Sequence, residues 1–148
     1  MLLSRRSLLA IAAVVDVALH ARPLPVAAKA LAARHNLPPR HLETVLQALV
    51  RKGLLKGVRG PRGGYELARE RRRVTAGDIV RAAMTDGAEE ALAPLPESQL
   101  VDAIVEPVVR RATDAFLAEL DKVTVDDLCG EAEAKLQPRT AGTTDFTI

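Results

Sequence analysis

The chain has 148 residues, of which 48% are hydrophobic but only 2% aromatic. Its core must therefore be aliphatic, which favours helices because Ala and Leu are good helix formers. A single cysteine, Cys129, excludes an intrachain disulfide and an all-cysteine metal site within one chain, which fits a reducing cytoplasm. No apolar run reaches the roughly 18 residues of a membrane span, so we expect a cytoplasmic protein with no membrane contact.

The charges separate along the chain. Residues 34–73 contain eleven Lys or Arg and three Glu, whereas residues 86–133 contain thirteen Asp or Glu and three basic residues. A basic half joined to an acidic half predicts a face that binds a polyanion and a separate segment with another role. The alternative interpretation of the basic half is an ordinary solvated surface.

Residues 1–21 resemble a twin-arginine export signal, because Ser4-Arg5-Arg6-Ser7 precedes a short apolar stretch. However, Asp16 closes that stretch, and His20 and Arg22 stand where a small-residue cleavage site belongs. We therefore predict a structural first helix. Its buried stripe is predicted from helical spacing to be Leu8, Ile11, Ala12, Val15 and Leu19.

Two short helices are predicted next, over residues 26–35 and about 40–52, joined by a turn at residues 36–39. Pro39 can open the second of these helices, since proline is tolerated in a first turn, and Gly53 ends it. The predicted apolar side of the first is Ala27, Ala30 and Leu31. The predicted buried face of the second is Leu42, Val45, Leu46 and Leu49. Two short helices joined by a tight turn form the helix-turn-helix pattern.

A β-hairpin is predicted after these helices, with strands at residues 54–58 and 64–67. Its tip, Arg59-Gly60-Pro61-Arg62-Gly63, carries two arginines, and its glycines permit the positive φ angles of a tight turn. After an extended lead-in at residue 74, a further helix is predicted to be capped by Thr75, with Asp78 in its first turn.

The acidic, proline-broken residues 86–96 are predicted to be a loop. One long amphipathic helix is predicted over residues 97–120, and Pro107 should kink or interrupt it. Its apolar stripe is too long for a domain of about 85 residues to cover, so we expect a homodimer. The expected interface residues are Leu100, Ile104, Val108, Ala112, Phe116 and Leu120. A short helix near residues 121–128, beginning at Thr124, is predicted to precede a flexible tail.

In a helix-turn-helix, the second helix enters the major groove of DNA and places its N-terminal residues at the base edges. The expected base contacts are Arg40, His41, Glu43 and Thr44. Phosphate contacts are expected further along the helix, at Gln47 and Arg51. The alternative for Arg40 and His41 is an ordinary exposed helix start.

The hairpin tip completes the expected DNA-binding set. Arg59 is predicted to enter a minor groove, because a narrow A·T-rich groove attracts an arginine, and Gly60 lies beside it. Arg62 is expected to contact phosphate.

The hairpin also carries a family resemblance. Residues 58–68, Val-Arg-Gly-Pro-Arg-Gly-Gly-Tyr-Glu-Leu-Ala, resemble the wing of the redox response factor (IscR-like) family of winged-helix transcription repressors. Further matching stretches are residues 16–19, 42–43, 53–54, 78–82 and 120–128, so the resemblance covers about residues 1–128. It implies a winged helix followed by a long helix that crosses its copy in a partner chain.

The chain departs from this family in two places. Cluster-binding members carry three cysteines before the long helix, whereas residues 88–98 contain none and Cys129 lies far downstream. Carboxylates such as Glu89, Glu90 and Glu97 suit a hard cation but not an iron–sulfur cluster, so we expect no cofactor and no metal. Members also often begin the recognition helix with a small polar residue and Tyr. Arg40 and His41 stand there instead, so the preferred operator is expected to differ.

The sequence thus predicts a mostly α fold with a small β-hairpin wing: a winged helix-turn-helix plus a long dimerisation helix. We expect a DNA-binding domain at residues 1–85, a loop at 86–96, a dimerisation region at 97–129 and a flexible tail at 130–148. The expected function is a homodimeric, DNA-binding transcriptional regulator, a repressor, with an unidentified small-molecule effector. Cys129 is either a small buried hydrophobe or a redox handle.

Two other classes of function compete with this prediction. A winged-helix module that binds a partner protein, with no sequence-specific DNA binding, is the alternative, and salt-dependent retention on DNA separates the two. A metal- or thiol-based sensor enzyme is disfavoured because His20, His35 and His41 are scattered with no ligand spacing and no catalytic set is evident.

Overall fold

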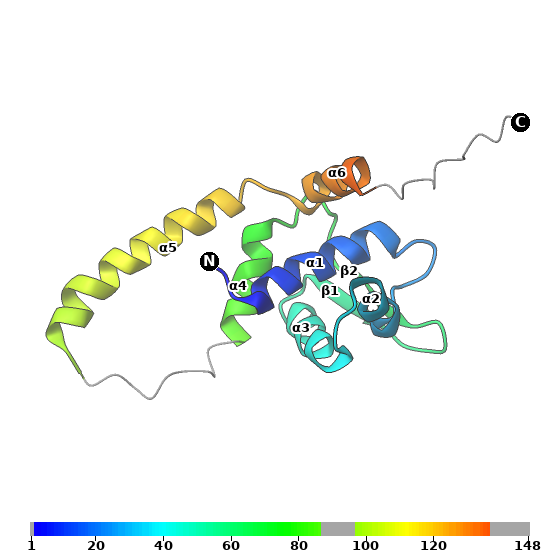
Figure 1. The fold of residues 1–148 in the computed structure, drawn as a ribbon, viewed down its shortest axis with the longest axis horizontal. Coiled ribbons are helices and arrows are strands. Elements are labelled where there is room, and N and C mark those ends of the chain that lie inside the picture. Colours follow the sequence, from blue (N-terminus) through cyan, green and yellow to red (C-terminus); the bar gives the residue numbers. More distant parts are fainter. Residues whose placement is uncertain (1, 87–96, 137–148) are drawn as a thin grey trace, which may run out of the picture.

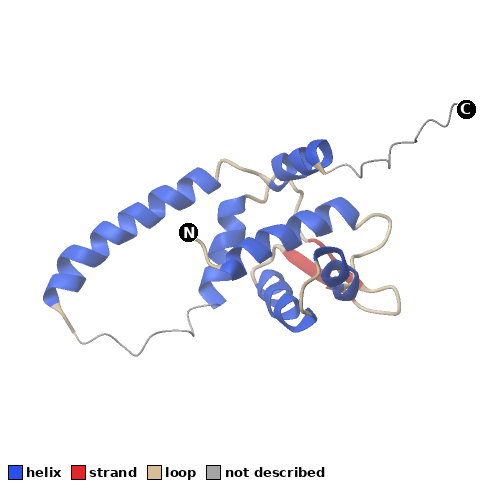
Figure 2. Ribbon diagram, viewed as in Figure 1, coloured by secondary structure: helices blue, strands red, loops and turns tan. Residues whose placement is uncertain are grey.

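The structure is a computed structural model that describes residues 2–86 and 97–136. Helices dominate these residues, and one antiparallel hairpin accompanies them (Figure 2). In chain order the elements are α1 (Arg5–His20), α2 (Ala28–His35), α3 (Pro39–Arg51), β1 (Leu55–Val58), β2 (Gly64–Leu67), α4 (Ala76–Asp86), the π-helical η2 (Val101–Val105), α5 (Glu106–Leu120) and α6 (Val125–Lys135). This arrangement confirms the predicted class, a mostly α fold with a small β-hairpin.

Helix α1 runs through the middle of the domain that α1–α4 and the hairpin form (Figure 1). Ser4 caps it, because the Ser4 Oγ accepts a hydrogen bond from the Ser7 N–H at 3.2 Å. None of the predicted stripe is fully buried: Leu8 is 39% exposed and Ala12 is exposed, whereas Ile11, Val15 and Leu19 are partly buried against the core. The residues that α1 buries are Ser7, Ala10, Ala13, Val14, Asp16 and Val17. The helix is apolar almost all round, so several stripes have helical spacing, and the one with small alanines allows the neighbouring helices to pack closely.

Helices α2 and α3 form the predicted helix-turn-helix. Helix α2 begins at residue 28 rather than 26, because Val26 pairs with Tyr65 of the hairpin. Only Leu31 of its predicted apolar side is buried, together with Ala32. All four residues of the predicted buried face of α3 are buried: Leu42, Val45, Leu46 and Leu49.

Helix α4 has the predicted cap. The Thr75 Oγ accepts from the Asp78 N–H at 3.0 Å, and the Asp78 carboxylate accepts from the Thr75 N–H at 3.1 Å. These two reciprocal bonds satisfy backbone groups that the first turn of a helix leaves unpaired. Ile79 and Val80 are fully buried, so α4 is packed into the same core as α1.

The long helix, made of η2 and α5, stands out from the domain as an arm (Figure 1). Pro107 does not interrupt it. In a regular α-helix a proline lacks the N–H for the backbone hydrogen bond and clashes with the carbonyl four residues earlier. The turn before Pro107 is wider than an α-helical turn, because the Glu106 N–H bonds to the Val101 carbonyl, five residues back. A π-helical turn of this kind accommodates the proline within a continuous helix.

Helix α6 is longer than predicted. Thr124 starts it with a capping box to Asp127, as expected, but it extends to Lys135, so the prediction of a tail from residue 130 was wrong for residues 130–135. Val125 and Cys129 are buried and pack one face of α6 against the core. This packing stabilises the helix, so that it continues for another turn beyond Gly130. The rest of the predicted tail, residues 137–148, and residues 87–96 of the predicted loop lie outside the described residues; Asp86 ends α4.

None of the helices in residues 2–86 and 97–136 has the length and apolar character needed to cross a membrane.

Candidate nucleic-acid interface

The exposed face of α3 collects the polar residues predicted to contact DNA. Arg40, Glu43, Thr44, Gln47 and Arg51 follow the spacing i, i+3, i+4, i+7 and i+11, so they share one side of the helix. All are exposed, as is His41 beside them. The opposite side of α3 is buried in the core, which fixes the orientation of this polar face.

Within this face, Thr44 is tied to its own helix. Its Oγ1 donates a hydrogen bond to the Arg40 carbonyl at 3.1 Å. The hydroxyl proton is therefore used inside α3, and the methyl group and the oxygen lone pairs of Thr44 are available for outside contacts.

The turn before α3 sets the angle between α2 and α3. Asn36 adopts a left-handed conformation with a φ of 51°, which a short polar side chain tolerates. The Leu37 N–H then bonds back to the Ala32 carbonyl at 3.0 Å. Pro39 stands in the first turn of α3, where its missing N–H is not needed.

The hairpin tip presents the two predicted arginines. Arg59, Gly60 and Arg62 are all exposed. Gly60 has a φ of 116°, which other residues rarely adopt, and its carbonyl accepts from the Gly63 N–H at 2.9 Å. In Figure 1 the hairpin loop and α3 both lie along the lower edge of the domain, whereas α6 lies along its upper edge.

A backbone bridge that the sequence analysis missed holds the hairpin in place. Val26, just before α2, exchanges two hydrogen bonds with Tyr65 of β2, at 2.9 and 2.8 Å. A side chain on Gly64 would collide with the Val26 carbonyl, so this close approach requires glycine. The Gly63-Gly64 doublet before an aromatic residue was the available signal, but the sequence analysis assigned Gly63 to the turn and Gly64 to the second strand without predicting a close approach of another segment.

Asp16 forms the second feature that was missed. Its side chain is only 3% exposed. It accepts hydrogen bonds from Arg34 Nε at 2.9 Å and Arg34 Nη2 at 2.6 Å, and it lies 2.7 Å from His35 Nε2. His20 Nδ1 is 3.5 Å from the same carboxylate. The carboxylate on α1 therefore holds the C-terminal end of α2.

The pKa of Asp16 reflects opposing influences. Burial raises it, but the hydrogen bonds from Arg34 and His35 and the positive charges of Arg34 and His20 outweigh burial, so the pKa lies below its ordinary value of 3.8.

The predicted dimer stripe divides into two parts. Leu100, Ile104 and Val108 are 66%, 58% and 52% exposed, and Ala112 is also exposed. Phe116 and Leu120 are partly buried, near the point where the long helix rejoins its own domain. The single chain thus leaves the first four residues of the stripe uncovered.

The end of α5 is fastened to α4. Arg81 donates to both carboxylate oxygens of Asp121, at 2.6 and 2.8 Å, and this pairing lowers the pKa of Asp121. The Ala76 N–H bonds to the Val123 carbonyl and the Val125 N–H to the Val74 carbonyl, both at 2.8 Å. The direction of α5 is thus set from its C-terminal end.

Solved structures share this fold over nearly the whole chain. An IscR from T. potens matches with a TM-score of 0.69 and 30% sequence identity, covering 93% of each chain. CymR, the global cysteine regulator of B. subtilis, matches with a TM-score of 0.65 and 27% identity, covering 88% of this chain and 98% of CymR.

Sequence comparison finds similar relatives. One relative is the Synechocystis protein slr0846, which is described as an HTH-type transcriptional regulator. It is 33% identical to this chain over 139 residues, and the match covers 90% of this chain and 91% of that protein. CymR of Bacillus subtilis, also an HTH-type transcriptional regulator, is 33% identical over 114 residues, 74% of this chain and 79% of CymR.

The Rrf2 family model, described as an iron-dependent transcriptional regulator, matches residues 3–131. The single cysteine of the sequence and the described residues do not fit an iron–sulfur cluster. Across the described ranges, no three His, Cys, Asp or Glu side chains are grouped so that they could hold a metal ion. Cys129, the only thiol in the sequence, is buried, and burial raises its pKa above the ordinary 9.0. An iron–sulfur cluster needs several thiolates close together.

The family model, the curated relatives and the solved structures agree with one another and with the resemblance drawn from the hairpin motif. The family model, the curated relatives and the CymR structure are named for regulators rather than enzymes. The chain belongs to the Rrf2 family of winged-helix proteins and is a DNA-binding transcriptional regulator.

Proposed function

We propose that this regulator is a homodimeric repressor that inserts α3 into the major groove of its operator and the hairpin tip into an adjacent minor groove. The observation that carries the proposal is the single polar, exposed face of α3, on a helix that lies along the same edge of the domain as the hairpin loop (Figure 1). Docking of this kind is typical of a helix-turn-helix, whose second helix lies in the major groove.

On α3, the N-terminal residues contact base edges. Arg40 suits guanine O6 and N7, Glu43 accepts from cytosine N4, and Thr44 bonds a base or touches a thymine methyl. His41 lies beside them, and Gln47 and Arg51, one and two turns on, contact phosphates.

At the tip, Arg59 enters the minor groove, where a narrow A·T-rich stretch concentrates negative potential. Gly60 lets the backbone approach closely, and Arg62 contacts phosphate.

The dimer forms through the long helix. Leu100, Ile104, Val108 and Ala112 are exposed along one stripe, and a contiguous apolar surface of this kind in a regulator marks an interaction site. A second copy presents the same stripe, so the contact is symmetric, and Phe116 and Leu120 lie at its edge. Two linked domains then bind two half-sites on one side of the duplex.

Repression follows from occupancy, because a dimer on the operator excludes other proteins from that DNA. We place its action in the cytoplasm, where the DNA of its bacterial relatives lies.

Selection of bound fragments from the source genome, followed by titration at several salt concentrations, tests the proposal. Each phosphate contact should add nearly one unit to the slope of log K against log salt. A flat salt dependence, or no fragment retained, would reject DNA-binding by this face and favour a winged-helix module that binds a partner protein.

A further inference from the structure

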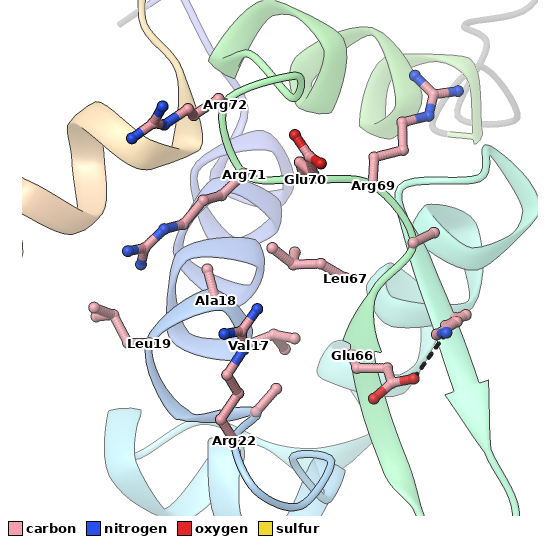
Figure 3. A pocket seen from close by; sticks show the side chains of 13 residues that line it. Val17, Ala18, Leu19, Arg22, Glu66, Leu67, Arg69, Glu70, Arg71 and Arg72 are labelled. Atoms are coloured by element: carbon pink, nitrogen blue, oxygen red, sulfur yellow. Dashed lines mark ion pairs between the residues drawn. The ribbon is translucent and has the colours of Figure 1, made fainter.

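A groove lies on the side of the domain where α1, β2 and residues 68–72 meet, with a volume of about 810 Å³ (Figure 3). Its floor is apolar. Val17 is fully buried, and Ala18, Leu19 and Leu67 are partly buried against the core. No part of α3 or of the hairpin tip lines it, so the groove is separate from the DNA-binding residues proposed above.

The rim of the groove is basic. Five basic and two acidic side chains line it. Lys56 and Glu66 neutralise each other across the hairpin at 3.0 Å, and Arg71 pairs with Asp126 of α6 at 2.9 Å. Arg22 has no acidic partner among the residues that the structure describes.

The positions of the arginines matter more than their number. In Figure 3 the Arg22 side chain rises from the end of α1 toward Val17, and Arg71 descends from the other side of the groove toward Leu19. Two guanidinium groups therefore flank an apolar floor, one of them with no carboxylate to satisfy it. An arginine binds a carboxylate through two parallel hydrogen bonds, and a half-buried apolar floor favours an apolar ligand body.

We propose that this groove binds a small organic anion with an apolar body, its carboxylate on Arg22 and its body on Ala18, Leu19 and Leu67. The inference rests on the proposed function, because it makes the groove the effector site of the regulator.

The groove is connected to the hairpin. Lys56, Glu66 and Leu67 belong to the two strands, and three residues link Arg22 to Val26, which bridges Tyr65. A ligand that spans Arg22 and Leu67 thus contacts both of the segments that this bridge joins, without contacting Val26 or Tyr65. Its binding changes operator affinity, and operator DNA changes ligand affinity by the same factor.

The probe is 3-phenylpropionate, a carboxylate with an apolar ring, added to the full chain while backbone amide shifts are recorded by NMR. We expect saturable shifts at residues 17–22 and 66–71. Arg22→Ala should weaken binding roughly tenfold, as expected for the loss of one charge-assisted pair. Arg5→Ala, which removes an exposed arginine at the other end of α1, should leave binding unchanged. The uncharged 3-phenylpropanamide should produce much smaller shifts.

Three results would overturn the inference: no saturable shift in the groove, equal binding of the acid and the amide, or equal binding by Arg22→Ala and the wild type. A reduced salt slope of DNA binding in Arg22→Ala, with probe binding unchanged, would instead make the groove a phosphate contact. DNA binding measured without the probe separates failure of this site from failure of the proposed function. Matching circular dichroism spectra and melting temperatures establish that both variants are folded.

Discussion

Asp16 of α1 lies buried beneath Arg34 of α2, with the Arg34 Nη2 2.6 Å and Nε 2.9 Å from its two carboxylate oxygens. Because both atoms of the guanidinium fork are used, this pair fixes the position of the first helix of the helix-turn-helix on the core. His35 and His20 approach the same carboxylate.

Asp16→Asn should lower the free energy of unfolding at pH 7 by about 1.5–3 kcal/mol, the usual contribution of hydrogen bonds to a charged group. The pKa of Asp16 is lower in the folded chain than the 3.8 of an ordinary aspartate, so its contribution is complete above pH 3.8 and disappears as the pH falls through the folded-state pKa. Urea unfolding of wild type and variant between pH 7 and 3 measures this. Glu131→Gln, at an exposed carboxylate, is the control. A wild-type-to-variant difference that grows as the pH falls below 3.8 would contradict the assignment.

Gly64→Ala should destabilise the fold by about 2–3 kcal/mol, in the range for a substitution that strains packed backbone. The added methyl group collides with the Val26 carbonyl, so the hairpin must separate from residue 26, and operator affinity should fall with it. Gly57→Ala is a matched control in the neighbouring strand, because an added Cβ there has no atom within 4 Å. Equal melting temperatures for the two variants would show that the bridge contributes little.

Arg59→Ala should weaken operator binding by about 1–3 kcal/mol, chiefly on operators with A·T-rich flanks. The reason is the exposed position of Arg59 at the tip and the stronger negative potential of a narrow minor groove. Fluorescence anisotropy on paired operators with A·T-rich and G·C-rich flanks measures the effect. Equal losses of affinity on the two operators would indicate that Arg59 contacts a phosphate and not the minor groove.

Ile104→Asp should convert the dimer to a monomer and abolish operator binding at the same protein concentrations, because two half-sites require two linked domains. Ile104 lies in the middle of the exposed stripe of the long helix. Leu24→Asp, which places the same charge at an exposed leucine outside that helix, should remain dimeric. Sedimentation velocity gives the oligomeric state, and a monomer that keeps full operator affinity would reject the coupling.

The purified protein should be colourless and should bind its operator equally well with or without iron and sulfide. The sequence has one thiol, and it is buried in α6, whereas a cluster requires several accessible thiolates. Anaerobic reconstitution followed by absorption spectroscopy is the measurement. A stoichiometric brown product that alters operator affinity would refute the prediction.

The elements that could be predicted are those whose signals are local. The buried face of α3 could be predicted from four aliphatic residues at helical spacing. The caps at Thr75 and Thr124 could be predicted because an aspartate stands three residues after each threonine. The exposed positions of Arg40, Thr44 and Arg59 followed from the same spacing and from the turn at residues 59–63.

The features that were missed depend on contacts between distant segments. The Val26–Tyr65 bridge joins residues 39 positions apart, and nothing near Val26 indicates a strand. The stripe of α1 was assigned wrongly because apolar residues surround the helix, and only its neighbours decide which side is buried. Asp16 was interpreted as the end of an apolar stretch, whereas in the fold it is the buried partner of an arginine 18 residues later.

Because the long helix is attached to its own domain near its C-terminal end, a small rotation there produces a larger displacement at its N-terminal end. The 15 residues of α5 alone extend about 22 Å at about 1.5 Å per residue, so a tilt of about 5° at the Arg81–Asp121 contact displaces the far end of α5 by about 2 Å. In the proposed dimer the partner domain moves with that far end. A small rotation at one ion pair would thus change the distance between the two recognition helices, and with it the half-site spacing that the dimer can occupy.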